Sequence, residues 1–195
     1  MKMTIDSKID AFVSKVNSSS REPLPPEEVP EFLRIGSPDN YGQFMWSIKR
    51  SDCEWMQGWF EAFEREMHLK FPPSFESLYS RYAFPAFQCG PVFLHANTGY
   101  DLESEISINW EFKERIFKDK GLVEALLPAG YLQFGNPHET DYDPICFDTK
   151  NRRDDGECPI VGIDHEEILC WSKIRVAKVI ASSFLELIEN YKGSV

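Results

Sequence analysis

The chain has 195 residues, of which 42% are hydrophobic and 14% aromatic, and its 32 acidic against 21 basic residues give a formal net charge of -11. This length supplies one substantial hydrophobic core and is too short to need two. The acidic balance disfavours binding to nucleic acid and to anionic membrane surfaces, and it favours basic protein partners.

Two features of the chain indicate a cytoplasmic protein. No long apolar run follows the first six residues, so we expect neither a signal peptide nor a membrane span. The five cysteines are widely spaced and form no CxxC pair, which argues against a zinc ribbon, a redox motif or a disulfide framework. Cys146 and Cys158 could face each other across a hairpin, but two buried free thiols are the commoner outcome in a reducing cytosol.

The first 50 residues predict a helix and a connector. An apolar stripe at helical spacing marks the helix and consists of Ile5, Ile9, Phe12, Val13 and Val16. Residues 23–30 contain too many prolines for a helix or a central strand, so we expect an extended or turn-like connector. A ligand for an SH3-like partner is the less favoured alternative for this segment.

Two more helices are predicted in the next part of the chain. Residues 51–54 fit a capping box, and the aromatic side chains between Trp55 and Met67 share one helical face, which indicates a core more than a ligand box. The second helix begins after Pro72 and Pro73, with Ser74 as its candidate cap. A strand over residues 91–96 follows, and residues 101–127 are predicted to be mostly helical, with a second short helix at 122–127.

Three short apolar runs organise the C-terminal half. They are Gly130–Gly135, Ile145–Asp148 and Pro159–Asp164, each bounded by turn-forming residues, and this pattern predicts consecutive antiparallel strands. We therefore predict an α+β fold in which a mainly antiparallel sheet of about four to six strands packs against helices. Residues 168–171 are predicted to be a short strand, and a capping box at 183–186 opens the last helix.

The polar residues of this region match no familiar metal or nucleotide pattern. His138 to Asp143 is an acidic turn, and Asp164-His165-Glu166 lies further along, but their spacing fits neither an EF-hand loop nor HExxH. The chain also lacks a GxGxxG motif and a P-loop. We expect no cofactor and no metal.

Catalytic groups are equally hard to assemble. No GxSxG nucleophile elbow occurs, and a cysteine nucleophile would need His165 beside Cys146, Cys158 or Cys170. Carboxylate pairs built from residues such as Asp141 or Asp148 arise by chance in so acidic a chain. We predict no catalytic residues, and a small hydrolase or metal-dependent enzyme is the less favoured alternative.

A family resemblance rests on an ordered series of residues in the predicted meander: Gly130, Leu132, Phe134, Gly135, Asp141, Cys146-Phe147-Asp148 and Pro159-Ile160-Val161. Flanking features are Phe71-Pro72-Pro73-Ser74-Phe75 with Leu78 and Tyr82, Asp164-His165-Glu166, and Ser182-Ser183-Phe184. This series resembles the signature of the SUKH superfamily, which includes Smi and Knr type cell-wall regulators and many bacterial immunity proteins. The resemblance covers residues 65–192, so we expect an appended N-terminal part, 1–50, and a SUKH-like domain, 51–195.

The resemblance implies a non-enzymatic protein-binding module. Proteins similar to this one are commonly immunity proteins that neutralise a cognate toxin, often a nuclease. A nuclease that grips a phosphate backbone presents a basic cleft, and an acidic partner gains association rate and selectivity from it. The candidate contacts are the acids of the meander loops, expected to be exposed: Asp141, Asp143, Asp154, Asp155 and Glu157. Two alternatives stay open: the acids form only solvated turns, or the protein is a regulatory scaffold of the cell-wall regulator kind.

Overall fold

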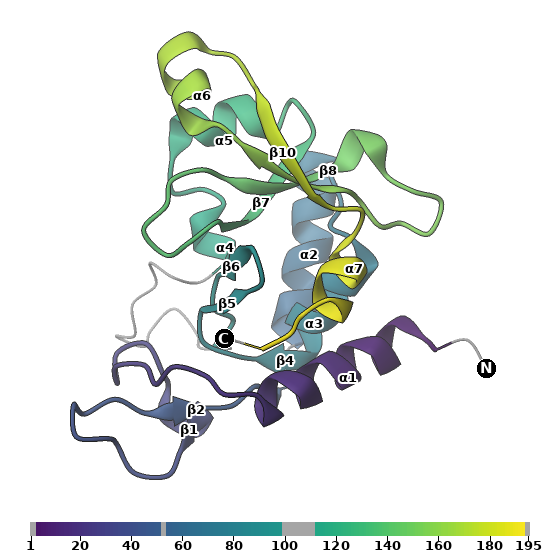
Figure 1. Cartoon of the computed structure of the whole chain (residues 1–195). Coiled ribbons are helices and arrows are strands. Elements are labelled where there is room, and N and C mark those ends of the chain that lie inside the picture. The colour runs from purple at the N-terminus through teal and green to yellow at the C-terminus, as the bar shows by residue number, and fades with distance from the viewer. Residues whose placement is uncertain (1–2, 52–53, 99–111, 194–195) are drawn as a thin grey trace.

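The computed structural model describes residues 3–51, 54–98 and 112–193. Within these ranges the chain forms seven α-helices, a six-stranded antiparallel sheet and two small two-stranded sheets (Figure 1). The predicted α+β class, with a mainly antiparallel sheet packed against helices, is confirmed.

The six-stranded sheet has the order β10-β9-β8-β7-β6-β5. Its strands are β5 (Phe87–Cys89), β6 (Val92–Leu94), β7 (Tyr131–Asn136), β8 (Ile145–Asp148), β9 (Ile160–Ile163) and β10 (Val176–Ala181). Every neighbouring pair is antiparallel, and β7, β8 and β9 are the predicted meander. The small sheets pair β1 (Arg34–Ile35) with β2 (Met45–Trp46), and β3 (Lys49–Arg50) with β4 (Tyr82–Ala83).

The helices divide between the two faces of the large sheet. They are α1 (Ile5–Ser18), α2 (Glu54–Met67), α3 (Pro73–Arg81), α4 (Phe112–Arg115), α5 (Lys120–Leu126), α6 (His165–Trp171) and α7 (Phe184–Glu189), with 3-10 turns η1 (Glu31–Leu33) and η3 (Thr149–Asn151). Successive strand residues point to opposite faces. In β9, Ile160 therefore joins the main core with α1, α2, α3 and α7, whereas Val161 and Ile163 join a smaller core with α5 and α6.

Aromatic rings fill the main core around Phe75 of α3. Its ring centroid lies 5.1 Å from that of Phe147 in β8, 5.5 Å from Phe134 in β7 and 5.3 Å from Phe184 in α7. Phe134 and Phe147 stack across the two strands at 4.0 Å. Such ring contacts stabilise a core beyond the area that they bury. The aromatic face of α2 packs here as well, as the helical spacing predicts.

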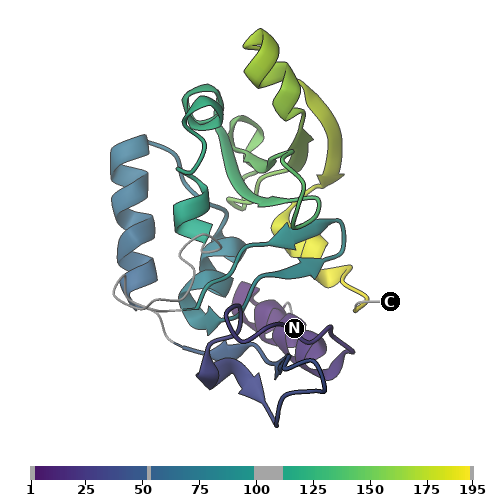
Figure 2. The same ribbon diagram turned by 90° about the vertical axis from the view of Figure 1, so that its left-hand side faces the viewer.

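The N-terminal segment packs directly on the rest of the chain. The predicted stripe of α1 is buried from Ile9 to Val16 and belongs to the main core, where the Phe12 ring lies 5.6 Å from the ring of Tyr191. The Asp10 carboxylate accepts hydrogen bonds from the Tyr82 hydroxyl and from Arg81, both at 2.6 Å. Figure 2 shows α1 at the end of the molecule opposite α6.

One predicted strand is wrong. Residues 168–171 end helix α6 instead, because the Asp164 side chain caps this helix by accepting from the Glu167 N–H, and acidic Glu166 and Glu167 occupy its positive first turn. A short apolar run cannot be assigned to a strand or a helix from its own pattern, so the cap decides.

A strand that the sequence analysis omits, β10, follows α6. It forms the sheet edge beside β9, and register shifts interrupt its pairing between Val176 and Lys178 and again between Val179 and Ala181. Because of these irregularities, apolar and polar residues do not alternate strictly along β10. Strict alternation is the pattern that predicts a half-buried strand.

The predicted helix caps have different outcomes. Ser183 caps α7 by accepting from the Glu186 N–H, while the Glu186 carboxylate accepts from the N–H of Ser182. Ser74 is not the cap of α3, because Pro72 holds that position and Ser74 donates to Glu157. The capping box at 51–54 and much of the predicted 101–127 helix lie outside the described residues.

A prediction follows for Gly135, where β7 passes close to β6. A Cβ atom here would lie 2.6 Å from the Phe93 carbonyl oxygen, in a backbone that sheet pairing holds in place. We expect Gly135→Ala to lower the free energy of unfolding by about 2 kcal/mol, as overpacking does. Urea unfolding followed by circular dichroism measures this loss.

Gly58 provides the matched control. It lies in the middle of α2 with nothing within 4 Å of its added Cβ atom. Gly58→Ala should raise the free energy of unfolding by about 0.5–1 kcal/mol through helix propensity. Equal effects of the two substitutions would contradict the close approach at Gly135.

Candidate partner-binding site

The five candidate acids lie in two loops at opposite ends of the meander. Asp141 and Asp143 belong to the connection between β7 and β8, and Asp154, Asp155 and Glu157 belong to the connection between β8 and β9. Successive connections of an antiparallel meander lie at alternate ends of its strands, as Figure 1 shows for these two loops. The candidates therefore do not form one continuous acidic surface.

Glu157 is a correction, because it is buried and not an exposed loop acid. Only 1% of its surface is exposed, and its carboxylate accepts hydrogen bonds from the Ser74 N–H at 3.1 Å and the Ser74 hydroxyl at 2.8 Å. A buried carboxylate needs such donors. Glu157 thus fastens its loop to the start of α3 and is not available to a partner.

Asp154 and Asp155 are exposed on the same loop. Asp155 forms an ion pair with Arg153 at 2.7 Å and also accepts from the Glu157 N–H at 3.1 Å. Nearby, Arg152 donates to the carbonyl oxygens of Gly156 and Lys70. The loop is therefore held in shape by its own side chains, with Asp154 and Asp155 at its surface.

The β7–β8 loop is held by its two aspartates. The Asp141 carboxylate accepts from the Asp143 N–H at 3.0 Å, and one Asp143 oxygen lies 2.8 Å from His165 Nδ1 and 3.1 Å from the His165 backbone nitrogen. The side chain between them, Tyr142, is 74% exposed. These contacts fix the backbone on both sides of an exposed aromatic ring.

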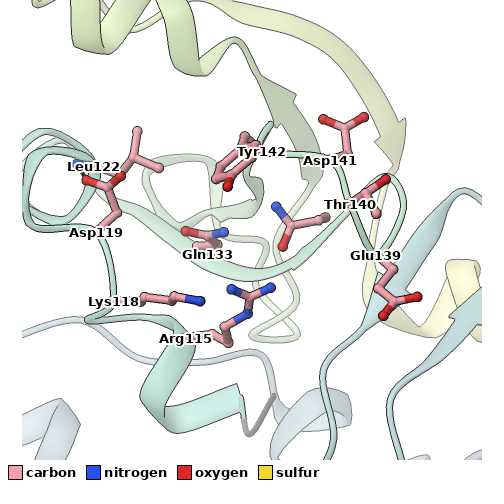
Figure 3. Close-up of a pocket in the computed structure, with 10 residues that line it drawn as sticks. Arg115, Lys118, Asp119, Leu122, Gln133, Glu139, Thr140, Asp141 and Tyr142 are labelled. Carbon is pink, nitrogen blue, oxygen red and sulfur yellow. Dashed lines mark hydrogen bonds between the residues drawn. The ribbon is translucent and has the colours of Figure 1, made fainter. Parts of the chain in front are cut away.

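A cavity of about 460 Å³ lies beneath this loop (Figure 3). Its lining comes from α4, α5, β7 and the loop itself: Arg115, Lys118, Asp119, Leu122, Gln133, Asn136, Glu139, Thr140, Asp141 and Tyr142. Asn136 is buried and its amide donates to the Asp143 carbonyl at 3.1 Å, whereas Glu139 and Thr140 are exposed. The cavity thus has an inner side at the sheet and an outer side at the loop.

Arg115 is a half-buried base in the cavity lining. Burial lowers the pKa of the half-buried Arg115 below its ordinary value, while the nearby Tyr142 opposes this shift. Next to this region, His95 follows β6 and is 1% exposed. Burial first, and then the charge of Arg115, lower the pKa of His95 to about 3, so its imidazole is neutral at physiological pH.

The family model described as SMI1/KNR4 family (SUKH-1) matches residues 57–190, well over half of the chain. The chain belongs to the SMI1/KNR4 family. A comparison with curated proteins gives no match. The suspected SUKH relationship is therefore confirmed, and the matched region contains the whole six-stranded sheet and the cavity.

The glycines of the family-like series have physical roles in this SMI1/KNR4 member. Gly130 precedes β7 with φ of 78°, a conformation that favours glycine, and Gly135 permits the contact of β7 with β6. Phe134 and Phe147 of the same series form the stacked pair of the core. The resemblance thus rests largely on residues that build the sheet.

Burial disfavours the thiolate form at three of the described cysteines of this family member. Burial raises the pKa of Cys158 to about 11 and that of Cys89 to about 12, and it places the pKa of the Cys146 thiol well above its usual range. Cys170 is exposed on α6. His165, the base considered with them, is engaged by Asp143.

Within residues 3–51, 54–98 and 112–193, no helix is both long enough and apolar enough to cross a membrane. Nor do three or more His, Cys, Asp or Glu side chains of these ranges gather in a way that could hold a metal ion.

The sequence does not reveal the basic and amide residues that line the cavity. Arg115 and Lys118 lie in a charged stretch that reads as a solvated helix, and Gln133 alternates with buried residues in β7 as any strand residue does. They come together only because α4 packs against β7. The acidic turn His138–Asp143 is the local sequence feature that indicates this site, and it forms the loop side of the cavity.

The buried link between Glu157 and Ser74 predicts a stability effect. Glu157→Ala leaves the Ser74 N–H and hydroxyl buried without an acceptor, and we expect the free energy of unfolding to fall by about 2–3 kcal/mol. Asp154→Ala, in the same loop but exposed, should change it by less than about 0.5 kcal/mol. In denaturant titrations, a loss in Ser74→Ala/Glu157→Ala equal to the sum of the single losses would contradict the link.

Two groups give opposing contributions to stability as pH changes. Burial raises the pKa of Glu76 in α3 to about 7 from 4.5 in the unfolded chain, so this group destabilises the fold as pH rises through that window. The pKa of His95 is lowered from 6.5 to about 3, so this group destabilises the fold as pH falls through that window. Between pH 4.5 and 6.5 the two effects offset each other.

We therefore expect Glu76→Gln and His95→Leu to change the pH dependence of folding stability in opposite directions. Glu76→Gln should raise stability above pH 7 and leave a fold that weakens on acidification, because only the His95 effect remains. His95→Leu should leave a fold that strengthens on acidification towards pH 4.5. Thermal unfolding midpoints across this range test both, and unchanged slopes would refute the assignment.

Proposed function

We propose that the protein is a non-enzymatic protein-binding module, and specifically an immunity protein that neutralises a basic toxin domain of the nuclease type. Membership in the SMI1/KNR4 family supports a binding module of this kind. The net charge of -11 supports a basic partner, because complementary potentials speed association and select between partners. Such an immunity protein acts in the cytoplasm.

The observation that carries this proposal is the exposed Tyr142 between two anchored aspartates. Its ring is 74% exposed, although large aromatic side chains of this protein are mostly buried. Tyrosine is among the residues that contribute most to binding at protein interfaces, and a fixed backbone lowers the entropy cost of ordering it. Asp141 and the exposed Glu139 add negative charge on either side.

The β7–β8 loop is the primary contact in this proposal. Asp141 and Asp143 lie there, with Asp143 partly engaged by His165, whereas Asp154 and Asp155 lie at the other end of the meander. A standard interface covers about 800 Å² on each partner, so a compact partner centred on Tyr142 contacts one end of the sheet. Asp154 and Asp155 then remain secondary candidates.

Catalysis is not part of the proposal. The buried thiols with raised pKa values disfavour a cysteine nucleophile, because the thiolate is the reactive form. The Asp143 carboxylate and His165 form a pair, but the cysteine that would complete a triad at this place is buried in the sheet or exposed on α6.

A second candidate function is a regulatory scaffold of the cell-wall regulator kind. Exposed apolar side chains gather on α6 and β10, where Trp171 is 69% exposed, Leu169 54% and Val179 70%. Contiguous exposed apolar surface is a feature of protein interaction sites. This surface favours a stable complex with a host protein in place of a toxin.

The test uses a basic toxin domain encoded beside the gene, in co-expression survival and pull-down assays. We expect the wild-type chain to protect, and Tyr142→Ala to weaken the complex by about thirtyfold, the scale of an interface hot spot. Asp141→Asn should slow association most at low salt, because screening removes this contribution at high salt.

The double substitution Asp154→Asn/Asp155→Asn is the matched control, since it removes two exposed acids from the other end of the meander. It should leave the complex within about twofold of wild type. A complex that depends on Asp154 and Asp155 but not on Tyr142 would contradict the proposed interface and would place it at the β8–β9 loop. A complex with host proteins that depends on Trp171 would favour the scaffold.

A further inference from the structure

Another cavity lies where the N-terminal segment meets the β5–β6 hairpin. Its volume is about 580 Å³, which falls within the range of small-molecule sites. Figures 1 and 2 show residues 191–193 close to both parts, so three segments far apart in the sequence meet here. Apolar and aromatic side chains contribute to its walls: Leu24, Trp46, Ala86, Phe87, Phe93 and Tyr191.

Arg21 supplies a buried positive charge to the lining of this cavity. Only 9% of its surface is exposed. Its Nη1 donates to the Val16 carbonyl oxygen, and its guanidinium carbon lies 5.2 Å from the centroid of the Trp46 ring. The described residues give its Nε no hydrogen-bond partner, and none of their carboxylates forms an ion pair with the group. Buried charges normally have an opposite charge beside them, so Arg21 retains donors for an anion.

The groups around Arg21 are held in place by contacts within the chain. The Trp46 indole N–H donates to the Glu22 carbonyl oxygen at 3.2 Å, and the Trp46 ring centroid lies 5.3 Å from that of Phe87. The Gln88 amide donates to the Pro137 carbonyl oxygen at 3.0 Å and so ties the hairpin to the β7–β8 connection. The cavity is therefore preformed, which lowers the entropy cost of binding.

The two acids of the lining oppose an anion less strongly than Arg21 attracts it. Glu22 and Glu139 are exposed, so water and salt screen their charges. Arg21 is buried, where charges interact more strongly because the surroundings are less polarisable than water. An anion that reaches Arg21 therefore gains more than it loses to the two acids.

We propose that this cavity binds a small carboxylate with an aromatic body. The carboxylate accepts hydrogen bonds from the N–H groups of Arg21 that the chain leaves unused, and the ring packs among Trp46, Phe87 and Phe93. Binding here needs no protein partner, so the proposal goes beyond the function proposed above and stands or falls independently of it. Such a ligand contacts both the N-terminal segment and the family-matched region, and it stabilises the folded chain.

The test is a two-dimensional NMR titration of the purified chain with three probes that share a phenyl ring: phenylacetate, the neutral phenylacetamide and the cationic phenethylamine. We expect phenylacetate to bind with a Kd of about 1 mM. The other two should bind at least about tenfold more weakly, because neither carries a carboxylate for Arg21. The Arg21 Nε–H and Trp46 indole N–H signals should move with phenylacetate, which locates the binding in this cavity.

A variant and a matched control connect the selectivity to Arg21. Arg21→Gln should weaken phenylacetate binding at least about tenfold and leave phenylacetamide binding nearly unchanged, so the preference for the carboxylate disappears. Arg34→Gln is the control, because Arg34 also donates to backbone carbonyls, those of Val29 and Pro26, and stacks over Phe44 at 4.4 Å, but does not line the cavity. Arg34→Gln should keep the wild-type preference.

Three results would overturn the proposal. The first is binding of phenylacetamide or phenethylamine to the wild-type chain as tightly as phenylacetate. The second is a folded Arg21→Gln variant that keeps the preference for phenylacetate. The third is the absence of NMR shifts with phenylacetate up to about 20 mM, a concentration far above the expected Kd. If Arg21→Gln does not fold, the comparison of the three probes on the wild-type chain decides the proposal.

Discussion

The position of Phe75 is the constraint on which the rest of the structure depends. Its ring contacts aromatic rings from α2, β7, β8 and α7 as well as Tyr79 of its own helix, so the helical layer and the sheet meet at this side chain. Ring packing of this density leaves little room for relative movement of the elements. The loops at the two ends of the sheet are thereby carried on a rigid frame, and a binding surface on such a frame loses little entropy when a partner is bound.

Much of this frame could be predicted from the sequence, because it rests on local patterns. The apolar stripes of α1 and α7 repeat at the helical period, and the three runs of the meander are short apolar stretches bounded by turn-forming residues. The sequence pattern did not decide the secondary structure where a run of residues fits a strand and a helix equally well. Ile168 to Trp171 fits a strand or a helix equally, and the Asp164 cap decided in favour of the helix.

The candidate site was harder to predict than the fold, for a physical reason. Side chains such as Glu157 and Asp154 are two acids of one polar loop and look alike in the sequence, yet one accepts two buried hydrogen bonds from a residue 83 positions away. Distant contacts of this kind also place Arg115 beside Gln133. A sequence shows which groups are available, but the convergence of groups on one cavity follows from tertiary packing.

The docking of α1 has a consequence for where the functional unit ends. The family match begins at residue 57, but Phe12 and Val16 of α1 are buried in the same core as the sheet, and Phe12 packs on Tyr191 beyond the other end of the match. A fragment cut at the family boundaries would present these apolar surfaces of α3 and α7 to water and would tend to self-associate. We therefore expect the smallest stable unit to extend from the first helix to Tyr191, whereas the family match leaves out residues 1–56 and Tyr191.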